Sequence, residues 1–188
     1  MAKALTPLQQ RGNAILRRLP PVARMAEVGV LRGALSAYLL ERAPCLDLVM
    51  VDNWRTAEDQ PEAYRATRDE HALHFDARRV ASHKADAVRV AAKFRGRASI
   101  ICDNSVSAAL AFADGAFDLV FLDADHSEEG VRADIDAWLP KVKPGGWIGG
   151  HDIDNDDPRY DFSGVRRAVD ALCPRFEKDE NYTWWERV

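Results

Sequence analysis

The stretch Ala26–Ser36, AEVGVLRGALS, passes from an apolar segment through two glycines into a sequence with helical spacing. Glycine has no Cβ and tolerates positive φ, so Gly29 and Gly33 permit a tight turn whose backbone a ligand can contact. The first turn of the following helix leaves N–H groups free for a carboxylate or phosphate, and Ser36 adds a side-chain donor. Such a turn is typical of a strand that ends at a ligand site in an α/β fold.

Short apolar runs alternate with helical spacing along the chain, and this alternation predicts a parallel sheet flanked by helices. The expected strands cover residues 25–28, 47–51, 98–102, 119–122 and 147–149, the last after a turn at 143–146. The expected helices cover residues 36–42, 82–94, 105–112, 128–139 and 164–172, after a first helix within 1–22 that packs on the sheet. A closing antiparallel hairpin at 175–178 and 182–187 completes a doubly wound, mostly parallel seven-stranded α/β sheet of the Rossmann-like type.

Length and composition limit the classes of protein. The 188 residues, 47% of them hydrophobic, can bury one sizeable core, so we expect a single domain over residues 1–188. The net charge of −4 disfavours a general nucleic-acid binder. No window approaches the roughly 20 apolar residues of a membrane span and no signal peptide is visible, so a cytoplasmic protein without a membrane partner is expected. The three cysteines lack metal-ligand spacing and are expected to be reduced core residues.

An acidic residue at the end of the second predicted strand indicates the ligand of the glycine turn. Asp52 follows Gly29 by 23 residues and is placed to accept hydrogen bonds from ribose hydroxyls. A glycine turn with a distal acid therefore indicates an adenosine-bearing ligand. The dinucleotide fingerprint G-x-G-x-x-G is not present, because Gly29 and Gly33 form a single wide pair. An NAD-dependent oxidoreductase is thus a disfavoured alternative, also because the chain has no recognisable Tyr-x-x-x-Lys pair.

Five stretches of the chain carry a wider resemblance. They are EVGVLRG (27–33), VDNW (51–54), CDNS (102–105), FDLVFLDADHSEEGVRADIDAWLPKVKPGGWIGGHDI (117–153) and YTWWERV (182–188). In this order they resemble the class I S-adenosylmethionine (SAM)-dependent methyltransferases, and most closely the small-molecule O-methyltransferases that act on sugars and macrolides. The resemblance implies a sheet whose last strand is reversed.

The resemblance also implies which residues bind SAM. The methionine part would be held by Glu27, Gly29, Gly33 and Ser36. The ribose would be held by Asp52, and the adenine edge by Asp103, Asn104 and Ser105, with Asp123 as a further contact to the cofactor.

Acidic and histidine side chains follow the fourth and fifth predicted strands. Adjacent parallel strands lie about 4.8 Å apart, so Asp123 and Asp152 can converge on one hard divalent cation, with His151 as a further ligand candidate. A bound metal lowers the pKa of an acceptor hydroxyl and orients it, and His126 is the candidate for the group that takes the proton. In some metal-dependent sugar methyltransferases a histidine three residues after the metal-binding aspartate is the base, and Asp123 and His126 match that spacing.

The metal site keeps several alternatives open. The pair His151-Asp152 departs from the two acids or the Asp-Asn of many relatives, so Mn²⁺ is considered beside Mg²⁺. The sequence does not decide whether His126 or His151 acts as the base. It also leaves open a site without metal, in which Asp123 contacts the cofactor or caps a helix.

Residues 53–95, between the second and third predicted strands, are expected to form a lid that selects the substrate. Aromatic and histidine residues concentrate there, namely Trp54, Tyr64, His71, His74, Phe75 and His83. From residue 65 to residue 97 the chain has nine Lys or Arg and four Asp or Glu. This excess indicates either a solvated helical face or a surface for an anionic substrate.

These features together predict O-methylation of a small hydroxylated metabolite, such as a sugar or an anionic compound, with SAM as methyl donor and Mg²⁺ or Mn²⁺ at the acceptor. A third hypothesis is an inactive cofactor-binding interaction module, which the retained Asp123, His126 and Asp152 disfavour. The expected partner is a small molecule, and RNA is not expected because no stacking motif is visible. The oligomeric state stays open, with a homodimer as one option.

Overall fold

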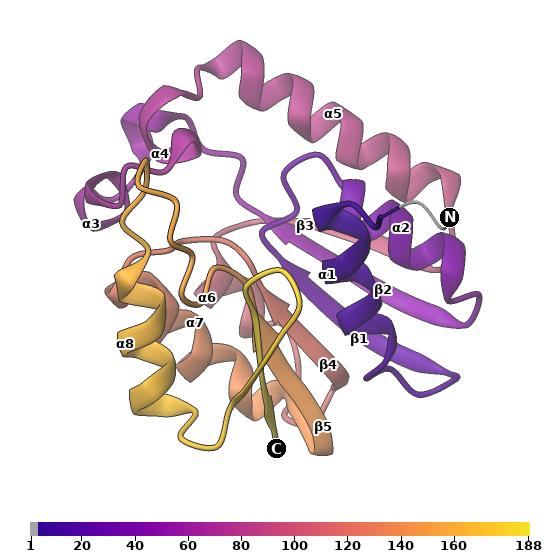
Figure 1. Cartoon of the computed structure of the whole chain (residues 1–188). Coiled ribbons are helices and arrows are strands. Elements are labelled where there is room, and N and C mark those ends of the chain that lie inside the picture. The colour runs from indigo at the N-terminus through magenta and orange to yellow at the C-terminus, as the bar shows by residue number, and fades with distance from the viewer. Residues whose placement is uncertain (1–3) are drawn as a thin grey trace.

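The computed structural model describes residues 4–188, which form a central seven-stranded sheet with helices on both faces (Figure 1). In spatial order the strands are β3 (Ala98–Cys102), β2 (Leu46–Asp52), β1 (Ala23–Val28), β4 (Phe117–Leu122), β5 (Val142–Gly150), β7 (Thr183–Arg187) and β6 (Glu177–Asp179). Strands β1 to β5 are parallel, and β7 runs antiparallel to both β5 and β6. The predicted doubly wound, Rossmann-like sheet with a reversed last strand is confirmed.

The two faces of the sheet follow from the period-two side-chain alternation of its strands. In β1, Met25 packs into one hydrophobic cluster and Ala26 into the other, and Leu48 and Val49 of β2 divide in the same way. One face is covered by α1 (Pro7–Leu16), α2 (Ala34–Arg42) and α5 (Ala77–Lys93). The other face is covered by α6 (Ser105–Ala109), α7 (Glu128–Trp138) and α8 (Ser163–Leu172).

Several boundaries differ from the predicted ones for local physical reasons. Helix α2 begins at Ala34, directly after Gly33, whose φ of +75° ends the turn. Helix α5 begins five residues earlier than predicted because Asp76 caps it by accepting a hydrogen bond from the backbone N–H of Arg79. Strand β5 begins at Val142, and the predicted turn at 143–146 is an irregular segment within it. Helix α6 ends at Ala109 rather than at 112, and the short 3₁₀-helix η2 (Leu139–Lys141) follows α7.

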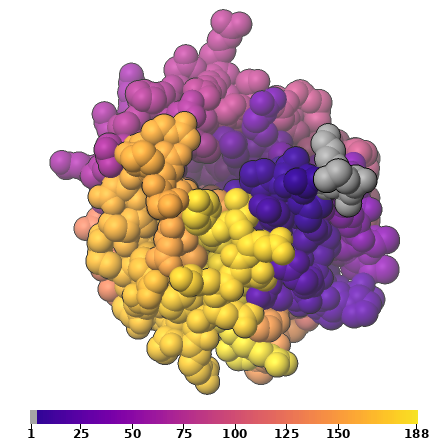
Figure 2. All heavy atoms as spheres, in the orientation of Figure 1, coloured from indigo at the N-terminus to yellow at the C-terminus, as the bar shows by residue number. Residues whose placement is uncertain are grey.

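The first helix, α1, ties the N-terminal part of the described chain to the closing hairpin. It starts with a capping box between Thr6 and Gln9. At its C-terminal end Arg18 forms ion pairs with residues of β6, and its guanidinium lies 4.3 Å from the Trp185 ring centroid. Figure 2 shows the indigo N-terminal segment lying against the yellow C-terminal segment on one face of the molecule. This docking brings the side chain of Arg11 to the carboxyl end of the sheet.

The segment between β2 and β3 covers the carboxyl end of the sheet (Figure 1). Before α5 it contains the 3₁₀-helix η1 (Ala57–Asp59), α3 (Glu62–Ala66) and α4 (Glu70–His74). The part before α5 is closed by a hydrogen bond of 2.8 Å from the Ala57 N–H to the Phe75 carbonyl. Thr67 accepts a hydrogen bond of 2.7 Å from the backbone of Asp161, in the loop before α8. The segment thus packs on both halves of the molecule, as a lid would, and a role in substrate selection stays a prediction.

The cysteine prediction needs correction. Cys173 is buried, but Cys45 and Cys102 are exposed, because they lie where a helix meets a strand and where β3 ends rather than in the sheet interior. All three thiols are free. Within residues 4–188, no helix combines the length and the apolar character that crossing a bilayer requires.

Candidate active site

The glycine turn after β1 packs tightly against the end of β4. Gly29 has a φ of +91°, and a Cβ at this position would lie 2.0 Å from the carbonyl oxygen of Asp123, at the end of β4. Only glycine therefore lets the turn pass so close to β4. The Gly29 N–H donates to the Val51 carbonyl at 2.9 Å, which fixes the turn against β2 as well.

Asp52, the predicted ribose acceptor, holds the turn in place. Its Oδ2 accepts hydrogen bonds from the backbone N–H groups of Val30 and Leu31 at 2.9 and 2.8 Å. Its Oδ1 accepts one from the N–H of Trp54 at 2.8 Å. Each carboxylate oxygen has a further lone pair, and Asp52 lines the cavity described below. The residue therefore organises the backbone and remains able to accept from a ligand.

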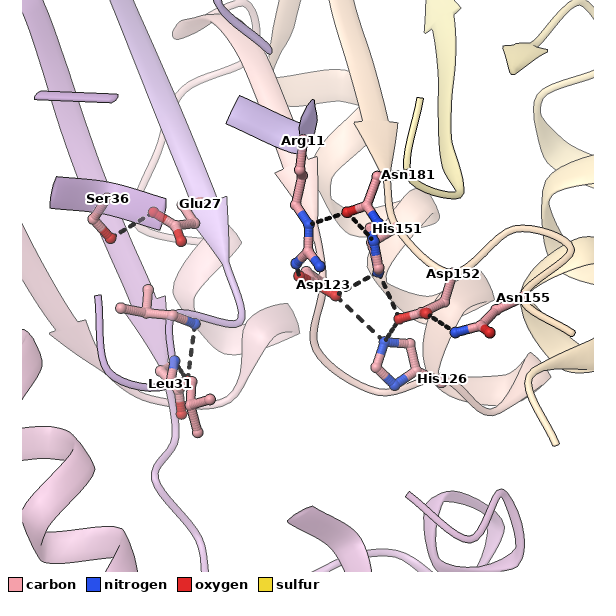
Figure 3. Close-up of polar contacts among 12 residues, drawn as sticks. Arg11, Glu27, Leu31, Ser36, Asp123, His126, His151, Asp152, Asn155 and Asn181 are labelled. Atoms are coloured by element: carbon pink, nitrogen blue, oxygen red, sulfur yellow. Dashed lines mark hydrogen bonds and ion pairs between the residues drawn. The ribbon is translucent and has the colours of Figure 1, made fainter. Parts of the chain in front are cut away.

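Glu27 and Ser36 form a buried pair behind the turn. Ser36 is fully buried, and its Oγ donates a hydrogen bond of 2.6 Å to Oε2 of Glu27 (Figure 3). Burial, opposed by this hydrogen bond, raises the pKa of Glu27 to about 8. Because α2 begins at Ala34, Ser36 faces the sheet, and its hydroxyl is committed to Glu27 rather than free for a ligand. In this arrangement Ser36 does not offer its hydroxyl for the expected direct contact with the cofactor.

A cavity of about 290 Å³ lies at the carboxyl ends of β1, β2 and β4. Predicted cofactor residues line it, namely Gly29, Asp52, Asp103, Asn104, Ser105 and Asp123. The side chains of Trp54, Tyr64 and Phe75 from the segment between β2 and β3 line it as well. Strand order reverses between β1 and β4, so the cavity is at the topological switch point where doubly wound sheets bind ligands.

The residues predicted at the adenine edge lie where β3 joins α6. Asn104 caps α6 by accepting from the Ser107 N–H at 2.9 Å. The Oγ of Ser105 accepts from the indole N–H of Trp138 at 2.8 Å. The side-chain amide of Asn104 keeps a donor for a ligand, whereas the Ser105 hydroxyl interacts with the buried carboxyl of Asp134.

Asp123, His126 and Asp152 converge beside this cavity, as Figure 3 shows. Each offers one ligand atom, and these atoms lie within 4.8 Å of one another. The His126 Nε2 is 3.0 Å from Oδ2 of Asp152 and 3.5 Å from Oδ1 of Asp123. The strand register explains the convergence. Leu122 at the end of β4 pairs with Gly150 at the end of β5, so the segments that follow the two strands leave the sheet side by side.

The environment of His126 fits a bound cation. His126 is 8% exposed, and within residues 4–188 its Nε2 has no partner with hydrogen-bond geometry, although two carboxylates face it. Burial by itself lowers the pKa of His126, but Asp152, Asp123 and Asp69 outweigh it and hold the pKa well above 6.5. Two carboxylates and one imidazole nitrogen are a donor set suited to a divalent metal.

His151 lies behind the cluster rather than in it. Its Nδ1 is 2.8 Å from Oδ2 of Asp152 but 3.8 Å from Asp123, and its Nε2 is 3.2 Å from Oδ1 of Asn181. Burial by itself raises the pKa of Asp152, but His126 and His151 keep it well below the usual range. In this arrangement His151 orients Asp152, and the third candidate ligand is the nitrogen of His126.

Sequence reasoning missed three supporting residues of the cluster. Arg11 of α1 forms an ion pair with Asp123 and donates to Asn181 at 3.4 Å. Asp69, before α4, is 2.9 Å from Nδ1 of His126. These contacts span 112, 170 and 57 residues of sequence, and no local motif marks them.

A buried acid on α7 was also missed. Asp134 is 5% exposed and lines the cavity. Burial raises the pKa of Asp134 from 3.8 to about 7, although a hydrogen bond with the Ser105 side chain lowers it. The nearby charges are Asp125, which raises this pKa, and His126, which lowers it.

We expect Asp134→Asn to stabilise the protein in a pH-dependent way. The folded-state pKa is raised, so wild-type stability is highest below about pH 4 and falls as pH rises to about 7. The uncharged asparagine avoids this loss, so its advantage should grow to the order of 1–4 kcal/mol above pH 7. Denaturant unfolding at pH 4.5 and pH 8 measures it. Asp136→Asn, an exposed site on the same helix, is the control, and an equal gain there would contradict the burial explanation.

Comparison with known proteins identifies the fold. Among solved structures, cofactor-bound Rv0187 from MTB has 18% identity and a TM-score of 0.63, covering 98% of this chain and 81% of that protein. The O-methyltransferase TomG from Streptomyces achromogenes, in complex with SAM, has 18% identity and a TM-score of 0.61, covering 98% and 82%. An rRNA methylase from Streptococcus thermophilus has 10% identity and a TM-score of 0.61, covering 100% and 99%.

The fold is therefore that of the class I SAM-dependent methyltransferases. Residues 26–153 match the family described as a methyltransferase domain, and the chain belongs to that family. None of the curated proteins matches the chain significantly. The predicted class of enzyme, a methyltransferase, is confirmed.

Proposed function

We propose that this methyltransferase uses SAM to methylate a hydroxyl group of a small metabolite. The observation that carries the proposal is the adjacency of the cavity at the switch point and the cluster of Asp123, His126 and Asp152, with Asp123 belonging to both. A methyl donor in the cavity would therefore meet an acceptor at the cluster. The likeness to TomG, an O-methyltransferase involved in tomaymycin synthesis, supports a small-molecule acceptor.

SAM is the cofactor that the cavity suits. The glycine turn, Asp52 and Asn104 all line it, and the side-chain amide of Asn104 keeps a hydrogen-bond donor. The structures of TomG with SAM and of cofactor-bound Rv0187 support this choice. NAD is the less favoured alternative because the turn lacks the third glycine of the dinucleotide fingerprint.

Asp123 and Asp152 are the residues that would hold Mg²⁺ or Mn²⁺ at the acceptor. When bound, the metal lowers the pKa of the acceptor hydroxyl. Oδ2 of Asp123 is paired with Arg11, so Oδ1 is the oxygen that faces the cluster. For Asp152, Asn155 donates to Oδ1 at 2.6 Å, and Oδ2 faces His126. One oxygen of each carboxylate thus faces His126, although Oδ2 of Asp152 is also 2.8 Å from Nδ1 of His151.

His126 is the base in this proposal. Its Nδ1 faces Asp69, so the proton of an acceptor hydroxyl would be taken by Nε2. The surrounding carboxylates hold the pKa of His126 well above 6.5, so this role needs the neutral imidazole, which a cation bound at Asp123 and Asp152 would favour. The same nitrogen belongs to the metal-ligand set, so His126 as a third ligand is the second candidate role. The two roles differ in their effect on metal affinity.

A sugar or an anionic metabolite is the proposed class of acceptor. The chain has a net charge of −4, which disfavours a polyanionic nucleic acid. Structural likeness to an rRNA methylase keeps RNA as a second candidate acceptor. A screen with labelled SAM, hydroxylated metabolites and RNA fragments, with and without Mg²⁺ or Mn²⁺, separates the two.

The cofactor is tested by calorimetry with S-adenosylhomocysteine (SAH) and with NAD. We expect SAH to bind and NAD not to bind. Asp52→Ala should weaken SAH binding by about 1.5–3 kcal/mol, the size of a hydrogen bond to a charged group. Asp47→Ala, an exposed position on the same strand, should leave the affinity unchanged. Binding of NAD in place of SAH would overturn the proposal, and circular dichroism checks that both variants are folded.

A further inference from the structure

One carboxylate from the segment that covers the sheet reaches the proposed base. Asp69 lies between α3 and α4, is 6% exposed, and uses its two oxygens for different purposes. Oδ1 caps α4 by accepting from the His71 N–H at 2.8 Å. Oδ2 is 2.9 Å from Nδ1 of His126. We call residues 57–76, which contain η1, α3, α4 and Asp69, the covering segment.

Asp69 is itself held firmly. Its N–H donates to Oγ1 of Thr67 at 3.2 Å, and the Thr67 hydroxyl donates to the Tyr64 carbonyl at 2.7 Å. Thr67 is also buried, and its carbonyl accepts from Asp161 in the loop before α8. The backbone that carries Asp69 is therefore fixed by hydrogen bonds within the covering segment and to the loop before α8, as the support of an orienting group must be.

The ring of His126 is confined between aromatic side chains. Its centroid is 4.5 Å from that of Phe162 and 6.2 Å from that of Tyr64. Packing thus limits the plane of the ring, and the contact with Asp69 selects which nitrogen faces the covering segment. The carboxylate of Asp69 favours a proton on Nδ1, as that of Asp152 does on Nε2, and Nε2 is the nitrogen turned toward Asp123 and Asp152.

We propose that Asp69 is a positioning residue, which holds His126 with its Nδ1–H toward the covering segment and its Nε2 toward the acceptor. The proposal rests on the proposed function in that His126 is the group that meets the acceptor. It adds a consequence for the lid, because the side chain that orients His126 belongs to the covering segment. The acceptor end of the site is complete only when this segment is docked, so substrate enclosure and orientation of the base occur together.

The test uses a variant that separates capping from positioning. Asp69→Ser keeps a good N-cap for α4 but is too short to reach His126. Asp76→Ser is the matched control, because Asp76 caps α5 in the same way and is exposed. In protein labelled with ¹⁵N-histidine, wild type and Asp76→Ser should show a low-field, slowly exchanging Nδ1 proton of His126. Asp69→Ser should lose this signal, which is assigned by its absence in His126→Gln.

Methyl transfer is measured on the same variants. Asp69→Ser should lower kcat by about 10–100-fold, the usual effect of losing the partner that orients a histidine, with SAH affinity unchanged. Asp69→Asn keeps the size, the cap and an acceptor oxygen, so it should keep the proton signal and most of the rate. If Asp69→Ser does not fold, Asp69→Asn still tests the proposal, because loss of the proton signal in a folded Asp69→Asn would contradict a contact that needs only an acceptor oxygen. An unchanged proton signal in Asp69→Ser, or an equal loss in Asp76→Ser, overturns the proposal.

These two readouts distinguish the proposal from the proposed function. The proton signal reports the contact between Asp69 and His126 whether or not the protein methylates the compounds supplied. Loss of the signal without any methyl transfer in wild type would support the positioning contact and count against the proposed function. A retained signal with a normal rate in Asp69→Ser would count against the positioning role alone.

Discussion

His126→Ala is expected to lower the rate of methyl transfer by about 10²–10⁴-fold, the usual contribution of a general base. Its Nε2 is the imidazole nitrogen that faces Asp123 and Asp152, and it lacks a hydrogen-bond partner in the described part of the chain. The loss should be smaller at high pH, where the acceptor hydroxyl ionises without help. Initial rates at saturating SAM from pH 7 to pH 10 measure both effects.

Binding measurements on the same variant decide between the two roles of His126. As a base, His126 is not needed to hold SAM or a metal, so His126→Ala should keep the affinities for SAH and for Mg²⁺. A large loss of Mg²⁺ affinity would instead make His126 a ligand. His74→Ala, an exposed position on α4, is the control and should keep the full rate. A fully active His126→Ala would remove the base from the mechanism.

Much of the fold was predictable because the strands carry their own signal. Residues such as Met25 and Ala26 alternate between the two faces, so strands β1, β2 and β4 were placed to within two residues. Most helix starts were also placed within two residues, but the start of α5 was missed by five because it depends on a single cap. Asp76 supplies one for α5, and the sequence pattern of residues 77–81 alone did not show it.

The candidate site was predictable only where it lies at strand ends. Asp123 and Asp152 follow β4 and β5, and parallel strands bring such residues together whatever the rest of the chain does. The pairing of Ser36 with Glu27 was not predictable, because the polarity of a serine does not reveal which face of α2 it occupies. Arg11 and Asp69 were missed because they reach the site from remote elements, and only tertiary packing determines that approach.

The arrangement around Asp123 explains how so many charges are buried together. Arg11 neutralises one side of the carboxylate, and burial, which by itself raises the pKa of Asp123, is outweighed so that this pKa lies below its usual value. A buried carboxylate without such a partner would be strongly disfavoured. The N-terminal helix therefore contributes to the site by keeping Asp123 ionised, which is the form that binds a metal.

Asp123→Asn and exhaustive chelation are expected to reduce turnover to a similar extent. A metal at the acceptor contributes several kcal/mol to the transition state, so turnover should fall by roughly 10²-fold or more. Asparagine keeps the shape of the side chain but removes the ligand charge, so excess Mg²⁺ or Mn²⁺ should restore only part of the activity. Initial rates with and without chelator, and with added metal, measure both effects.

Calorimetry separates the loss of a metal ligand from damage to the cofactor cavity. Because Asp123 also lines the cavity and pairs with Arg11, SAH affinity and thermal stability must be measured in parallel. Asp152→Asn, which does not line the cavity, should show the same loss of turnover with SAH binding intact. Asp114→Asn, an exposed position before β4, should behave as wild type. Full activity of the wild-type enzyme in chelator would show that Asp123 and Asp152 act without a metal.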